Sequence, residues 1–205
     1  RIFLFVVSYS LKLIPFLPKP ASQLKVAFIP TAGDLYEEKP WMDADRKKLE
    51  SLGFQMEEVD IANTQGPALK ERLSAVDVIF VAGGNTSYLL EKAQESGFLE
   101  ITRELVREGK VYIGSSAGSL LAGPNIEVDK VYDDGEFGKE LASYEGLGFV
   151  DFVPLPHADN PKYAPYLEKI FEQYSEEYDL RKLNDNQAIL VTDEKHQSHN
   201  INRAY

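Results

Sequence analysis

The chain has 205 residues, of which 43% are hydrophobic, so it can bury one substantial core but is short for two full domains. The 33 acidic side chains outnumber the 22 basic ones, and the net charge of -11 would repel nucleic-acid backbones and anionic lipid headgroups. Because cysteine is absent, disulfides, thiolate metal sites and a cysteine nucleophile are excluded. We therefore expect one domain over residues 1–205, with no nucleic-acid or membrane partner.

No apolar run approaches the roughly 18 residues of a membrane span, and the run at residues 2–7 is brief even for the core of a signal peptide. We interpret it as a buried strand and expect a cytoplasmic protein. Nothing in the sequence suggests a cofactor or a metal, and the oligomeric state stays open.

Short apolar runs rich in β-branched residues alternate along the chain with segments of helical period. The predicted strands are 2–7, 26–30, 54–61, 78–82, 111–114 and 189–192, and the predicted helices are 43–52, 68–74, 87–95, 100–108 and 162–174. Gly53 and Gly109 are expected to end helices, and Pro161 to begin one. This alternation predicts a mostly parallel sheet with helices on both faces. The polar segment 193–205 predicts a loop, an edge strand or a disordered tail.

A candidate nucleophile follows the predicted strand at 111–114. The sequence Gly114-Ser115-Ser116-Ala117-Gly118 is a G-x-S-x-G motif between a strand and helix-compatible residues, which is the setting of a nucleophile elbow. The glycines suit so tight a turn because strand and helix must approach closely. The alternative is that Ser116 only caps a helix, and the local sequence does not decide between the two.

A second glycine-rich turn, Gly83-Gly84-Asn85-Thr86, follows the predicted strand at 78–82. The carboxyl ends of parallel strands are where open α/β sheets bind ligands, so the N–H of Gly84 and that of Ala117 are candidates for an oxyanion hole. The turn could instead only reverse the chain, with Asn85 or Thr86 capping a helix. A phosphate cradle is less favoured, since no G-x-G-x-x-G or Walker sequence is present.

Three histidines are candidates for a general base. His196 and His199 lie in the polar tail, and their spacing is poor support for a metal site. His157 follows the apolar stretch 153–156 and precedes a turn, a position that suits a cleft. If the arrangement is a triad, the segment between Ser116 and His157 is expected to supply its acid. Candidates by chemistry are Glu127, Asp129, Asp133, Asp134 and Glu136, and spacing does not choose among them.

Three motifs in order resemble the serine peptidase family of peptidase E and cyanophycinase: the turn at 83–86, the elbow at 114–118 followed by Pro124-Asn125-Ile126, and Leu155-Pro156-His157. The resemblance implies a flavodoxin-like fold related to the class I glutamine amidotransferases. It also implies a Ser-His-acid triad whose acid follows the elbow helix. Asp133 matches that position best, with Asp134 as the close rival.

In peptidase E an arginine beyond the histidine reads an N-terminal aspartate of the substrate. Here Lys162 and then Arg181 are the nearest cations after His157, and the local pattern does not match, so the resemblance does not extend to aspartyl specificity.

The sequence therefore predicts a serine-type peptidase that hydrolyses a small peptide through an acyl-enzyme. Ser116 would be the nucleophile, His157 the base and Asp133 the orienting acid. Two alternatives stay open. One is an esterase of the α/β-hydrolase type, which shares the motif but usually needs more chain and a more distant histidine. The other is a catalytically silent binding module on the same scaffold.

Overall fold

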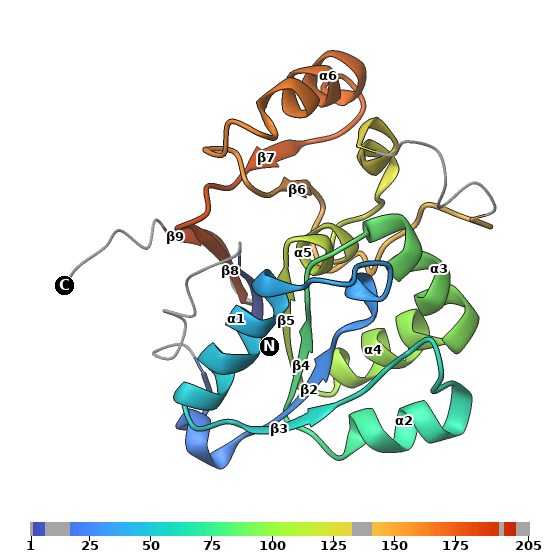
Figure 1. The fold of residues 1–205 in the computed structure, drawn as a ribbon, viewed down its shortest axis with the longest axis vertical. Coiled ribbons are helices and arrows are strands. Elements are labelled where there is room, and N and C mark those ends of the chain that lie inside the picture. Colours follow the sequence, from blue (N-terminus) through green and yellow to red (C-terminus); the bar gives the residue numbers. More distant parts are fainter. Residues whose placement is uncertain (1, 7–16, 133–140, 193–194, 200–205) are drawn as a thin grey trace.

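The computed structural model describes residues 2–6, 17–132, 141–192 and 195–199. Its main feature is a seven-stranded sheet in the order β3-β2-β4-β5-β1-β8-β9, which runs through the centre of the molecule (Figure 1). The strands are β1 Ile2–Val6, β2 Lys25–Ile29, β3 Gln55–Glu58, β4 Val78–Val81, β5 Val111–Ser115, β8 Ala188–Thr192 and β9 Lys195–His199. The first five are parallel, and β8 and β9 are antiparallel to their neighbours.

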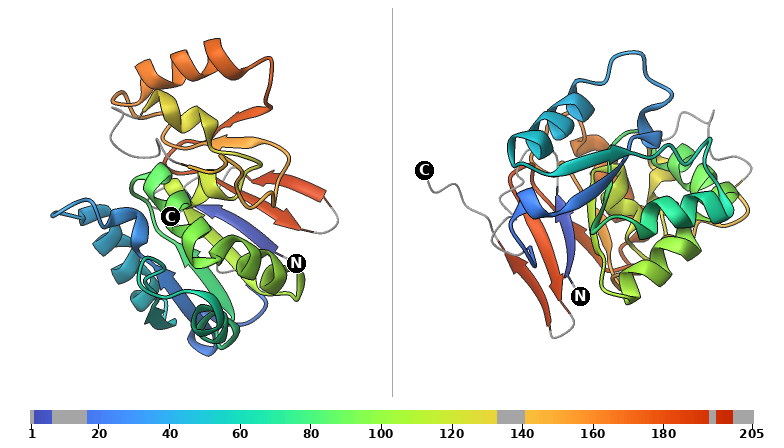
Figure 2. Two further views of the ribbon diagram at one scale, coloured as in Figure 1. Left: turned by 90° about the vertical axis from the view of Figure 1, so that its right-hand side faces the viewer. Right: turned by 90° about the horizontal axis from the view of Figure 1, so that it is seen from below.

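Helices cover both faces of this sheet (Figures 1 and 2). They are α1 Pro40–Ser51, α2 Gly66–Ser74, α3 Thr86–Ser96, α4 Phe98–Arg107, α5 Ala117–Leu121 and α6 Ala164–Tyr174. Alternating residues of each strand feed two cores: Phe28 and Phe80 face α1, whereas Ile79 and Val81 pack with α2 to α5. All four residues of β4 are buried, as a central strand of a parallel sheet requires.

Local sequence explains where several helices begin and end. The side chain of Asn85 accepts a hydrogen bond from the Tyr88 N–H at 2.8 Å and caps α3. Gly97, at a φ of 77°, ends that helix, and Gly53 and Gly109, two residues after the last residues of α1 and α4, also have positive φ values. Pro161 lies in a turn three residues before α6 instead of beginning it.

A small second sheet lies beyond the carboxyl ends of the central strands (Figure 1). Its strands, β6 Val153–Leu155 and β7 Leu180–Lys182, are parallel and are connected through α6. Sequence analysis recognised the apolar stretch of β6 but not β7 or the pairing. Of the alternatives for the polar tail, residues 195–199 form an edge strand. Among the described residues, no helix is long and apolar enough to cross a membrane.

Candidate active site

Ser116 occupies the sharp turn between β5 and α5. Its backbone has a φ of 50° and a ψ of -105°, in a region that residues with a Cβ rarely adopt. A Cβ at Gly114 would lie 2.3 Å from the Gly118 carbonyl oxygen, and one at Gly118 would lie 2.3 Å from the Val81 oxygen. Both glycines of the motif are therefore required by close backbone packing, and the turn has the form of a nucleophile elbow.

Two buried hydroxyl groups hold this turn from the protein interior. Ser119 Oγ donates to the Gly114 carbonyl at 2.9 Å, and the Tyr112 hydroxyl donates to the Gly118 carbonyl at 2.8 Å. Each bond ties α5 to β5 where the strained residue connects them. The Ser116 side chain is thereby fixed at the floor of a cavity.

His157 and Asp185 extend from Ser116 in series. Ser116 Oγ and His157 Nε2 are 2.9 Å apart, and His157 Nδ1 and Asp185 Oδ1 are 2.6 Å apart. The His157 side chain is 14% exposed, so the imidazole is largely shielded from water. Its ring stacks on Tyr163 with centroids 4.9 Å apart. A hydroxyl, an imidazole and a carboxylate are thus connected in the order that nucleophilic catalysis uses.

The small sheet explains why Asp185 meets His157. Leu155 of β6 pairs with Lys182 of β7, and the Ala158 N–H donates to the Leu183 carbonyl at 2.9 Å, so the loops after the two strands run side by side. The backbone N–H of Asp185 donates to the Asp159 carboxylate at 2.8 Å, which fixes the turn that carries it. Parallel pairing therefore places an acid that follows the histidine in sequence beside its imidazole.

The acids that the sequence offered as candidates differ in position and in hydrogen-bond partners. Asp133, Asp134 and Glu136 lie outside the described residues. Glu127 binds Lys130 and the Tyr178 hydroxyl, and these contacts lower the pKa of its carboxyl. Asp129 accepts a hydrogen bond from Ser87 Oγ at 2.9 Å.

Asp185 was not predicted from the sequence, because the acid was expected between Ser116 and His157. The one signal in the sequence is indirect: a short strand after α6 would have drawn attention to the turn that follows it. His196 and His199 lie on the edge strand β9, and no group of three or more His, Cys, Asp or Glu that could hold a metal occurs within the described ranges.

The glycine turn after β4 borders the same cavity. Gly84 has a φ of 151°, and a Cβ there would lie 2.0 Å from the Ala32 carbonyl oxygen, so only glycine fits. A Cβ at Gly83 would lie 2.9 Å from the Cβ of Ser116, which brings this turn against the elbow. Gly84 and Ala117 both line the cavity beside Ser116.

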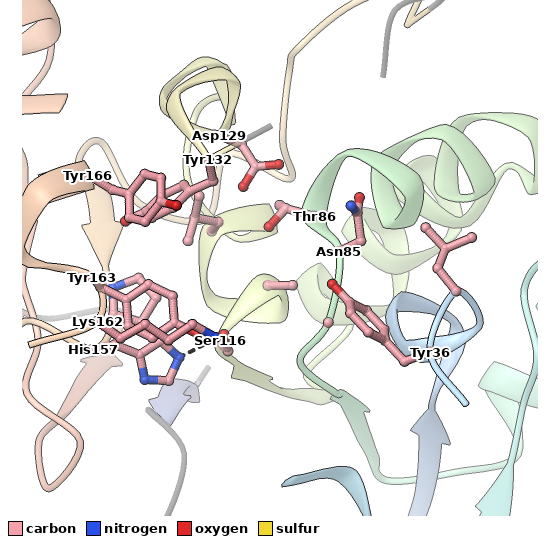
Figure 3. A pocket seen from close by; sticks show the side chains of 15 residues that line it. Tyr36, Asn85, Thr86, Ser116, Asp129, Tyr132, His157, Lys162, Tyr163 and Tyr166 are labelled. Atoms are coloured by element: carbon pink, nitrogen blue, oxygen red, sulfur yellow. Dashed lines mark hydrogen bonds between the residues drawn. The ribbon is translucent and has the colours of Figure 1, made fainter. Parts of the chain in front are cut away.

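The cavity has a volume of about 410 Å³ and opens above Ser116 (Figure 3). Tyr132, Tyr163 and Tyr166 lie on the His157 side, and Tyr36 lies across the cavity from them. Fifteen residues line it: Leu35, Tyr36, Gly84, Asn85, Thr86, Ser116, Ala117, Leu120, Asp129, Tyr132, Pro156, His157, Lys162, Tyr163 and Tyr166. The site thus combines aromatic walls with few charged groups.

The chain is similar to known peptidases over most of its length. The chain is 33% identical over 195 residues to the uncharacterized peptidase Lin0382 of Listeria innocua, covering 94% of this chain and 93% of that protein. It is 35% identical over 171 residues to peptidase E of Salmonella arizonae, covering 82% of this chain and 69% of that protein.

A crystal structure from Listeria monocytogenes EGD-e, solved as a candidate peptidase E protein, superimposes with a TM-score of 0.86 at 30% identity. The superposition covers 97% of this chain and 98% of the Listeria monocytogenes chain. The α/β fold predicted from sequence, a mostly parallel sheet with helices on both faces, is confirmed. The model of peptidase family S51 matches residues 8–199, so the chain belongs to that family and is the serine-type peptidase that its three motifs predict.

Proposed function

We propose that this peptidase hydrolyses the amide bond of a small peptide through an acyl-enzyme on Ser116, with His157 as general base and Asp185 as the orienting acid. The observation that carries the proposal is the continuous series of contacts from Ser116 Oγ through the His157 ring to Asp185, at the floor of a cavity. Asp185 takes the role that sequence analysis gave to Asp133, because its carboxylate lies at His157 Nδ1.

In the first half of the reaction, Ser116 Oγ attacks the carbonyl carbon while its proton passes to His157 Nε2. When the tetrahedral intermediate collapses, the C–N bond breaks and the imidazolium returns that proton to the leaving amine. Water, activated by His157 in the same way, then attacks the acyl-enzyme and releases the acyl residue as a carboxylic acid. Asp185 accepts from Nδ1–H throughout, which keeps Nε2 available for proton transfer and stabilises the imidazolium.

The N–H groups of Gly84 and Ala117 are the proposed donors to the oxyanion. Within the described part of the chain, neither N–H donates to another protein group, and both residues border the cavity beside the nucleophile. Preorganised donors of this kind stabilise the transition state because no reorientation is needed as the charge develops, and each contributes about 10²- to 10³-fold in rate.

The size and charge of the cavity support a short substrate. About 410 Å³ lies within the range of small-molecule sites, roughly 300 to 1,000 Å³, and suits a dipeptide or tripeptide. Of the described residues that line it, Lys162 is the one lysine or arginine. An arginine that could read an aspartate bidentately is not among them, so the proposal includes no aspartyl preference.

The direct test is the turnover of a dipeptide library by Ser116→Ala. We expect activity to fall by roughly 10³-fold or more, because alanine lacks the hydroxyl that attacks the substrate. Alanine keeps a Cβ, so the conformation of the elbow should not change. Ser175→Ala, an exposed serine at the end of α6, is the matched control and should retain wild-type activity. A Ser116→Ala enzyme with wild-type turnover would refute the proposal.

The cytoplasmic location expected from the sequence is part of the proposal. Fractionation of cells that express the full-length protein tests it, and recovery in the membrane or extracellular fraction would contradict it.

A further inference from the structure

The exposed large hydrophobic side chains of the described residues gather at one place. They are Leu35, Tyr36 and Tyr166, with 37%, 41% and 38% of their surfaces exposed, and all three line the cavity above Ser116. Large apolar groups are usually buried, and those left exposed around a cavity mark a surface that a ligand covers. The rim of this site is therefore suited to apolar parts of the substrate.

Tyr166 belongs to an aromatic surface that begins at the proposed catalytic imidazole. The ring of Tyr132 lies 5.1 Å from that of Tyr166 and 6.1 Å from that of Tyr163, between centroids. Tyr163 in turn stacks on His157 at 4.9 Å, with 21° between the ring planes. We name Tyr132, Tyr163 and Tyr166 the tyrosine wall; Figure 3 shows it on the His157 side of Ser116.

The proposed proton transfer from His157 to the leaving amine determines which part of the substrate meets the tyrosine wall. His157 must protonate the leaving amine, so that nitrogen has to come within hydrogen-bonding reach of Nε2, about 3 Å. We therefore assign the residue that carries this amine to the side of the imidazole and Tyr163. The acyl residue is assigned to the other side of Ser116, where Figure 3 shows Tyr36.

Asp129 lines the same cavity as the wall, and its carboxylate disfavours an acidic side chain there. Burial, and after it the negative charge of Asp129, raises the pKa of the Tyr132 hydroxyl. Lys162, whose Nζ lies 5.4 Å from the centre of the Tyr163 ring, suits the α-carboxylate of the leaving residue. The wall itself offers aromatic surface against which an apolar side chain can stack.

We propose that the tyrosine wall binds a large aromatic or aliphatic side chain of the residue released as the free amine. The inference rests on the proposed function, since it uses His157 as the proton donor to that amine. It assigns specificity to the leaving side of the scissile bond.

The first experiment varies only the leaving residue. The acyl residue is fixed as the best one found in the dipeptide library, and kcat/KM is compared for Phe, Leu, Gly and Asp in the second position. We expect Phe and Leu to exceed Gly and Asp by about tenfold or more, as aromatic stacking and burial of apolar surface together allow. Equal values for all four, or a preference for Asp, would overturn the proposal.

The second experiment removes one ring of the wall. Tyr166→Ala should lower kcat/KM for the Phe substrate by about tenfold and change that for the Gly substrate less than twofold, while Tyr166→Phe should retain the preference because the ring remains. Tyr174→Ala is the matched control, since it lies on the same helix and outside the cavity lining. An equal loss on both substrates, with an altered oligomeric state on size exclusion, would make this surface an interface between copies and overturn the proposal.

Labelling by a fluorophosphonate separates this inference from the proposed function. Labelling requires the activated serine but not a leaving residue, so the Tyr166 variants should react at the wild-type rate. Normal labelling without discrimination among leaving residues would refute the wall alone. Absence of labelling in the wild-type protein would refute the proposed function and, with it, the assignment of a leaving side.

Discussion

At the scale of single residues, the site depends on backbone conformations that most side chains avoid. Ser116 and His157 are the non-glycine residues with positive φ in the described part of the chain, at 50° and 63°. Each such conformation costs about 1 to 3 kcal/mol and persists only where the surroundings enforce it. Here both strained residues project their side chains toward one another. The strain is thus concentrated where two groups must meet at a fixed distance.

Asp185→Asn tests the proposed orienting acid. We expect kcat to fall by about 10³- to 10⁴-fold, because an amide can hold the imidazole in the wrong tautomer and cannot stabilise the imidazolium. Steady-state hydrolysis of the best dipeptide measures this, and Asp133→Asn is the control, with an expected change of less than about threefold. A severe loss in Asp133→Asn, together with near-normal activity in Asp185→Asn, would restore the acid that the sequence predicted.

Gly84→Ala tests the proposed oxyanion donor. The added Cβ would meet the Ala32 carbonyl oxygen at 2.0 Å, so the turn has to move and carry the Gly84 N–H away from Ser116. We expect a loss of about 10²- to 10³-fold in kcat. Gly109→Ala controls for backbone strain alone, since it has a φ of 108° and nothing within 4 Å of the added atom. Equal activity losses in the two variants would exclude a specific role for Gly84.

At the scale of elements, α1 contributes an ionisable group to the apolar interior. Asp45 is 7% exposed and belongs to the helix that packs on Phe28 and Phe80, and no other described Asp, Glu, Lys or Arg is so deeply buried. Burial raises the pKa of its carboxyl to about 7, and a hydrogen bond with the Ser115 side chain opposes that rise. The carboxyl therefore changes charge near neutral pH, and its partner Ser115 directly precedes Ser116 in the chain.

Asp45→Asn should remove a pH dependence of stability. The native state keeps the Asp45 proton up to about pH 7, whereas the unfolded chain loses it near pH 4, so the stabilisation is full below pH 4 and is lost as the pH rises to 7. Above pH 7 the free energy of unfolding of the wild type is therefore lower than in acid by up to about 4 kcal/mol. Asp45→Asn should not show this decrease. Urea unfolding at pH 5 and pH 8 measures the difference. The exposed Asp43→Asn is the control, and identical pH slopes for the two variants would contradict the argument.

The elements also show what the sequence could predict. Hydrophobic periodicity identified strands β1 to β5 and β8, and helices α1 to α4 and α6, to within a few residues, because each of these segments is several residues long and carries its own pattern. The pairing of β6 with β7 escaped prediction, since each strand has three residues and their partnership depends on contacts distant in sequence. The motifs around Ser116 and His157 are local and were found. Asp185 reaches His157 only through the pairing of β6 with β7, so no local motif identified it.

At the scale of the whole molecule, the site forms where two sheets meet. The central sheet supplies the Gly84 turn and the Ser116 elbow after the neighbouring strands β4 and β5, and the small sheet supplies His157 and Asp185 (Figure 1). The segment after α5 connects them: the N–H groups of Leu147 and Phe149 donate to the carbonyls of Leu121 and Ala122 at 2.7 and 3.0 Å. The Arg103 side chain donates to the carbonyls of Gly146 and Leu147 on the same segment. The distance between Ser116 and His157 is therefore set by the tertiary structure.

The most direct test of this account is the position at which a fluorophosphonate attaches. The wild-type protein is labelled at neutral pH, digested and analysed by tandem mass spectrometry, with Ser116→Ala treated in parallel. We expect one adduct, on Ser116, and none in the variant. An adduct on another serine, or equal labelling of Ser116→Ala, would contradict it.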